Sequence, residues 1–152
     1  MHVAIPLYPR FTALDVVGPY TVLAFAPGVT VTLVAAEPGP VLDDRGTMAI
    51  SATVGYAELP RPDVVVVPGG AGTRAALADT ALVSWIARAH AHTRWTTSVC
   101  VGSFLLGAAV PGGGRPATGA GSTSSGPSGP SRSGSGWSGT TGSSRRPVSR
   151  PA

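Results

Sequence analysis

Cys100, the only cysteine of the chain, stands in residues 97–103 (TSVCVGS), where a β-rich run gives way to a helical pattern. A cysteine followed two residues later by glycine at such a junction is typical of a nucleophile elbow, a tight turn that presents the side chain at the carboxyl edge of a sheet. The start of the following helix favours the thiolate over the thiol. The alternative is a buried cysteine that packs as a small hydrophobic residue.

A glycine-rich turn, residues 68–72 (PGGAG), comes directly after the apolar run 63–67 (DVVVV). Ligands of parallel sheets collect at the carboxyl ends of strands, and a turn of this kind exposes backbone N–H groups that can hold a developing oxyanion. The turn is not a nucleotide loop, because it lacks the Lys-Ser/Thr of a P-loop and the G-x-G-x-x-G spacing. An ordinary tight turn remains the alternative.

Asp15 lies among apolar residues where a helix is predicted to begin. Most acids in this position cap the helix in solvent. The alternative is a carboxyl group within hydrogen-bonding reach of Cys100, which burial would allow to act as an acid. His90 and His92 are interpreted as a solvated helix end, since no third metal ligand is evident. We therefore expect neither a metal nor a cofactor.

Short strands that alternate with helices must position these residues. The expected strands are residues 2–7, 29–35, 63–67 and 95–99, and the expected helices are 14–25, 73–91 with a break at Asp79-Thr80, and 102–109. Pro19 is expected in the first turn of its helix, where its missing N–H is tolerated. The unbroken apolar run 63–67 is typical of a strand that is covered on both faces. The pattern predicts an α/β fold with a parallel sheet between helices.

The composition divides the chain of 152 residues near Ala109. Residues 1–109 hold six Arg and seven acids, whereas residues 110–152 hold five Arg and no acid, and 28 of those 43 residues are Gly, Ser or Pro. Such a segment is predicted to be disordered. Since it alone makes the chain basic, residues 1–109 give no support for a nucleic-acid or membrane partner. No apolar stretch is long enough to span a membrane and no signal peptide is recognised, so we expect a cytoplasmic protein.

Three segments, IPLYPRFTALDVVGPYTVL, DVVVVPGGAG and TSVCVGSFLLGAA, resemble in order and spacing the DJ-1/PfpI superfamily of class I glutamine amidotransferase-like proteins, and within it the isonitrile hydratase-like branch. The resemblance implies a flavodoxin-like, doubly wound sheet, a homodimer and a small-molecule substrate. It implies Cys100 as nucleophile, Asp15 as its acidic partner, and Gly70, Ala71 and Val101 as oxyanion or substrate-binding residues. The implied reaction adds water to an isonitrile to give an N-substituted formamide.

Two features qualify this resemblance. The hydratase-like branch carries Thr after the cysteine, where this chain has Val101, which keeps the backbone N–H but not the hydroxyl. The ligand-sensing domain of AraC-type transcription regulators resembles the same superfamily, so such a sensor, with a DNA-binding domain beyond it, is the alternative function. The coding sequence beyond the final helix of the fold would distinguish the enzyme from the sensor.

The family pattern stops at Ala109, and the resemblance implies two later segments, Thr/Ser-His-Trp and T-S-A-G-V-S-A-G. A shifted frame, in which the third base of each codon joins the first two of the next, permits Ala-Thr-Ser-His-Trp from residues 114–119 and T-S-A-G-V-S-A-G from residues 144–152. Only one base of each shifted codon is free. We therefore expect residues 110–152 to be an out-of-frame translation, and residues 1–109 to be an incomplete, poorly stable and inactive domain.

Overall fold

The computed structural model describes residues 1–112, whose centre is a five-stranded sheet with the order β5-β2-β1-β6-β7. All four strand pairings are parallel. The strands are β1 (His2–Pro6), β2 (Thr30–Ala35), β5 (Val54–Gly55), β6 (Val64–Val67) and β7 (Trp95–Ser98). The predicted parallel sheet is confirmed. The predicted disordered tail lies outside the described residues, apart from its first three.

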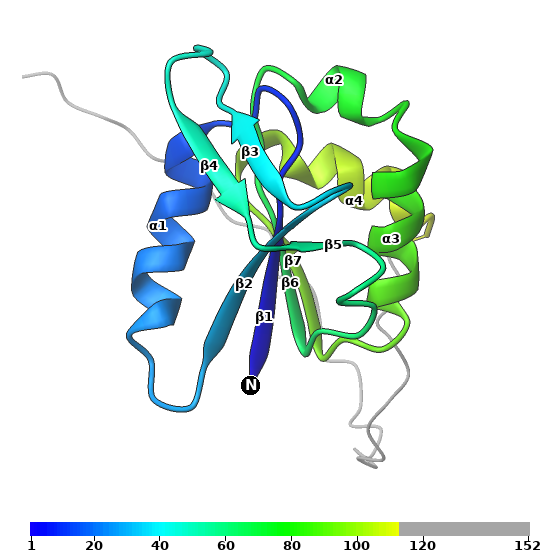
Figure 1. The fold of residues 1–152 in the computed structure, drawn as a ribbon. Coiled ribbons are helices and arrows are strands. Elements are labelled where there is room, and N and C mark those ends of the chain that lie inside the picture. Colours follow the sequence, from blue (N-terminus) through cyan, green and yellow to red (C-terminus); the bar gives the residue numbers. More distant parts are fainter. Residues whose placement is uncertain (113–152) are drawn as a thin grey trace, which may run out of the picture. The chain divides into compact units, whose positions relative to one another are not determined.

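The helices lie on both faces of this sheet. They are α1 (Ala13–Ala24), α2 (Thr73–Ala76), α3 (Thr80–His90), the short 3₁₀ turn η1 (Cys100–Gly102) and α4 (Ser103–Ala109). Figure 1 shows α1 on one side of the strands and α3 with α4 on the other. The chain moves from β1 to β2 in one direction across the sheet and from β6 to β7 in the other, and right-handed crossovers then place the connecting helices on opposite faces. This is the predicted doubly wound, flavodoxin-like fold.

The core lies between the sheet and its helices. Residues Val64–Val67 of β6 are all buried, which confirms a strand covered on both faces. The apolar side of α3 packs there through Leu82, Trp85, Ile86 and Ala89. The Tyr56 ring stacks on Trp85 with ring centroids 5.2 Å apart. None of the helices within residues 1–112 has the length and apolar character needed to cross a bilayer.

Of the two long helices, α3 begins at a side-chain cap and α1 does not. The Asp79 carboxylate accepts hydrogen bonds from the N–H groups of Ala81 and Leu82, which confirms the predicted break between α2 and α3. In α1 the N-cap is Thr12, so Asp15 lies inside the first turn. The prediction for Pro19 was wrong, because Pro19 lies in the interior of α1, where its missing N–H cannot bond to the Asp15 carbonyl.

An antiparallel hairpin formed by β3 (Gly39–Leu42) and β4 (Ala49–Ala52) was not predicted. In its turn, Asp43 Oδ1 accepts hydrogen bonds from the N–H groups of Thr47 and Met48. The hairpin supports the loop after β1, since Arg10 N–H donates to the Leu42 carbonyl at 2.9 Å. It therefore fixes the chain just before α1 begins.

Candidate functional site

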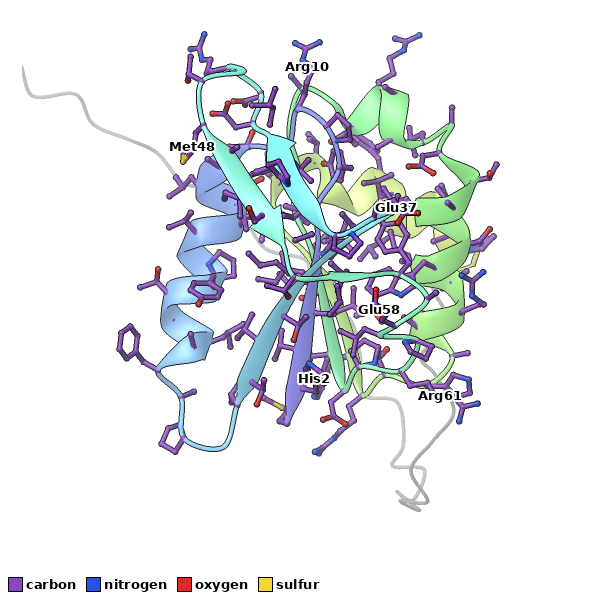
Figure 2. The ribbon with its side chains drawn as sticks, viewed as in Figure 1. His2, Arg10, Glu37, Met48, Glu58 and Arg61 are labelled. Carbon is purple, nitrogen blue, oxygen red and sulfur yellow. The ribbon has the colours of Figure 1, made fainter. Side chains whose placement is uncertain are left out.

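Three loops meet at the carboxyl edge of the sheet, after β1, β6 and β7. Thr12 N–H donates to the Gly69 carbonyl at 2.8 Å, and Gly72 N–H donates to the Arg10 carbonyl at 2.9 Å. Figure 2 shows Arg10 projecting outward at this end of the molecule and His2, at the start of β1, near the other end. From β1 the chain crosses to β2 on one side, and from β6 it crosses to β7 on the other side, so the strand order reverses between β1 and β6. The loops lie at this point of reversal, which is the usual ligand-binding position in open α/β sheets.

Cys100 is the first residue of η1, two positions after the end of β7 in the chain, and it is exposed. Its φ of 52° lies in the left-handed region, which non-glycine residues seldom adopt. Backbone strain of this kind costs about 1–3 kcal/mol and clusters at functional sites. The sharp turn presents the thiol at the edge of the sheet, which is the geometry of a nucleophile elbow.

Gly102 makes this turn possible. A Cβ at Gly102 would overlap the Val67 carbonyl oxygen and would lie 2.8 Å from that of Pro68. The elbow therefore packs directly on the end of β6, which brings Cys100 beside the glycine-rich turn.

Replacing Gly102 with alanine is expected to destabilise the fold by about 3 kcal/mol, because the buried backbone cannot move away from the added methyl group. Urea unfolding of the 152-residue chain measures the change. Gly107→Ala is the matched control, since a Cβ at Gly107 in α4 meets nothing within 4 Å and alanine favours the helix by roughly 1 kcal/mol. Equal midpoints for the two variants would contradict the close packing of the elbow.

The Asp15 carboxylate is buried, with 8% of the residue exposed. Its Oδ2 accepts a hydrogen bond from Gly69 N–H at 3.0 Å. No hydrogen bond joins Asp15 to Cys100 in the described part of the chain, although the sequence-based expectation placed them within bonding reach. Asp15 is thus neither a solvated cap nor a direct partner of the thiol, and it is held by the glycine-rich turn.

Gly69 separates the acid from the elbow. A Cβ added at Gly69 would lie 3.0 Å from Asp15 Oδ2 and 2.9 Å from the Val101 nitrogen. The distance between Asp15 Oδ2 and the Val101 nitrogen is therefore at most the sum of these two values, so the acid lies close to the elbow. A side chain at position 69 would fill this space. Sequence reasoning selected Gly70 and missed Gly69, because the PGGAG pattern does not tell which glycine faces the elbow.

Of the predicted oxyanion residues, Gly70 packs against the loop after β1, and Val101 lies beside Gly69. Gly70 has a φ of 149°, and a Cβ there would come within 2.5 Å of the Arg10 oxygen and the Thr12 nitrogen. The N–H groups of Gly70, Ala71 and Val101 donate no hydrogen bond within residues 1–112. Their role as oxyanion donors stays a prediction.

Other predicted features lie apart from this site. His90 ends α3 and its Nδ1 is hydrogen bonded to Thr96 Oγ1 at 2.9 Å, while His92 is exposed. Across residues 1–112, no group of three or more His, Cys, Asp or Glu residues is placed to hold a metal ion.

A cavity of about 370 Å³ adjoins the site on the side of β2. Its lining includes Tyr8, Tyr56, Glu37 and Asp79. Figure 2 shows Glu37 beyond the end of β2. Cys100 does not line the cavity, whereas Tyr8 does, and the Tyr8 hydroxyl group bonds to the Pro68 carbonyl of the glycine-rich turn.

The fold and the site define a doubly wound α/β protein with an exposed cysteine on a strained turn at the carboxyl edge of its sheet. The sequence profile of the DJ-1/PfpI family matches residues 1–127. The chain belongs to the DJ-1/PfpI family.

Known relatives agree with this assignment. The chain is 38% identical over 109 residues to an isonitrile hydratase from Pseudomonas putida, an alignment that covers 72% of this chain and 47% of the hydratase. The chain thus spans about half the length of that relative. A THiJ/PfpI family protein from Pseudomonas syringae superposes with a TM-score of 0.68 at 35% identity, covering 71% of this chain and 45% of that protein. DJ-1beta from Drosophila melanogaster shares the fold, with a TM-score of 0.62 at 23% identity over 71% of this chain and 59% of its own.

Proposed function

We propose that this chain carries the nucleophile and the acid of an isonitrile hydratase-like enzyme, which adds water to an isonitrile to give an N-substituted formamide. The observation that carries the proposal is the exposed Cys100 at a φ of 52°, beside a buried Asp15 held by Gly69. The 38% identity to an isonitrile hydratase supports this substrate class.

The reaction begins when the Cys100 thiolate adds to the terminal carbon of the isonitrile and a C–S bond forms. That carbon then carries a lone pair, and it takes a proton from the Asp15 carboxyl group to give a thioimidate. Water adds across the C=N bond, with one proton going to nitrogen. As Asp15 removes the hydroxyl proton, the C–S bond breaks, which releases the formamide and restores both the thiolate and the protonated acid.

Backbone donors assist the second half of the cycle. The N–H groups of Gly70, Ala71 and Val101 are available to hold the oxygen that water brings to the carbon. Val101 supplies a backbone N–H without a side-chain hydroxyl, so no further donor is assigned to it.

The working enzyme is proposed to be a homodimer. α1 and its C-cap residue expose five large apolar side chains, and exposed apolar surface is typical of protein interfaces. They are Leu14, Val17, Tyr20, Val22 and Phe25.

The C-terminal segment is proposed to be altered in this chain. The shifted frame permits two family-like segments in the order expected from the family. The printed residues 110–152 contain neither segment. Residues 110–152 are therefore treated as an out-of-frame translation, and the activity is assigned to the protein with the frame restored after Ala109.

In that frame-restored protein, Asp15→Asn is expected to lower kcat for a simple alkyl isonitrile by about 10²–10⁴-fold, because an amide cannot donate the proton that the carbanion requires. Formation of the formamide, measured by chromatography, reports the rate. Asp63→Asn is the matched control, since Asp63 is exposed and its Oδ2 accepts from His2 N–H near the other end of the sheet. Full activity of Asp15→Asn would remove the carboxyl group from the mechanism.

A further inference from the structure

Tyr8 is a buried polar residue that the proposed reaction does not use. Its hydroxyl group donates a hydrogen bond to the Pro68 carbonyl at 2.8 Å and shares a second, at 3.0 Å, with Thr73 Oγ1. Only 2% of Tyr8 and 4% of Thr73 are exposed. Because both groups are removed from water, the pair is a fixed part of the structure.

The hydrogen bond from Tyr8 to the Pro68 carbonyl acts on the peptide group whose N–H binds Asp15. The Pro68 carbonyl and the Gly69 N–H belong to one peptide unit, and this unit is trans. Tyr8 therefore binds the carbonyl at one edge of this peptide unit, while Asp15 Oδ2 accepts from the N–H at the opposite edge, at 3.0 Å. A hydrogen bond to the carbonyl polarises the peptide and strengthens its N–H as a donor.

Tyr8 is well suited to remain a donor. Burial raises the pKa of its hydroxyl group, the bond to Thr73 lowers it, and the negative charges of Asp15 and Cys100 raise it again. The net effect is upward, so the hydroxyl keeps its proton across the neutral range.

We propose that Tyr8 is a positioning residue, which with Thr73 orients the Pro68–Gly69 peptide and through it holds the Asp15 carboxylate beside the elbow. Its importance for catalysis rests on the proposed function. The hydrogen-bonded relay from Tyr8 through the Pro68–Gly69 peptide to Asp15 does not depend on that function.

The test is amide hydrogen exchange, followed by NMR, in the 152-residue chain. Tyr8→Phe removes only the hydroxyl group, and Gly69 N–H is expected to exchange about fivefold faster relative to Val65 N–H of the core sheet. The ratio to Val65 removes any change in global stability. Tyr56→Phe is the matched control, because the Tyr56 hydroxyl is also buried and donates to a backbone carbonyl, that of Leu7, at 3.3 Å.

Thr73→Val is the second variant. It leaves the Tyr8 ring in place and removes the partner that fixes the direction of the hydroxyl, so a smaller change of the same sign is expected at Gly69. Equal Gly69-to-Val65 ratios in wild type, Tyr8→Phe and Tyr56→Phe would overturn the relay. So would equal changes in the two tyrosine variants. Because no turnover is measured, absence of hydratase activity would refute the proposed function and leave this result intact.

Discussion

Cys100→Ser is expected to abolish hydration of isonitriles, with kcat reduced about 10⁴-fold or more, in the protein whose frame is restored after Ala109. Serine has nearly the same size as cysteine and can occupy the same turn, so the loss would report chemistry rather than folding. A serine hydroxyl is almost entirely protonated at neutral pH, and the three described loops of the site carry no histidine that could activate it. The formamide product, measured over time, gives the rate.

A control variant separates this loss from a general effect on the protein. Ser84→Ala changes an exposed side chain on α3, away from the three loops, and should keep full activity. Intact-mass analysis of the wild-type enzyme, taken at short times after mixing with substrate, should also detect the thioimidate adduct on Cys100. Retention of a tenth of the activity by Cys100→Ser would refute the nucleophile.

Restoring the frame is expected to convert a poorly stable, inactive chain into a stable, active dimer. In the described residues β7 is the edge of the sheet, and Trp95 on it is 63% exposed. An unpaired edge invites association, and a segment of Gly, Ser and Pro supplies neither a paired strand nor apolar cover. Since domains are stable by only ~5–15 kcal/mol, the loss of several packed elements should leave the 152-residue chain folded with only part of that margin.

The decisive measurement is the nucleotide sequence across the codons for residues 109–112 and onward. It is expected to encode Ser-His-Trp and T-S-A-G-V-S-A-G in the shifted frame. Urea unfolding and light scattering then compare the two proteins. Early stop codons in the shifted frame, or the absence of both segments, would mean that residues 110–152 are a genuine part of the protein.

The elements of the fold could be predicted where one residue type dominates a run. The four valines of β6 and the apolar face of α3 specify a buried strand and a helix without reference to the rest of the chain. The β3–β4 hairpin was missed because its strands have four residues each and are only partly buried. The Asp-Arg-Gly turn between them was the available signal.

The site could be predicted only in part, since its decisive contacts join distant residues. Cys100 and its glycine are two positions apart, so the elbow is a local pattern. Asp15 and Gly69 are 54 positions apart, and no spacing within either segment shows that they are bonded. Tyr8 is 60 positions from Pro68, and in the sequence it is one more aromatic residue after an apolar strand.

Pro19 in the middle of α1 has a consequence for how the acid is positioned. Without the bond from position 19 to the Asp15 carbonyl, the first turns of α1 lack the cooperativity that would let them form alone. The helix therefore gains its stability mainly from docking on the sheet. The position of the acid is thus set by tertiary packing of α1 and by the bond from Gly69 N–H, and not by the helix on its own.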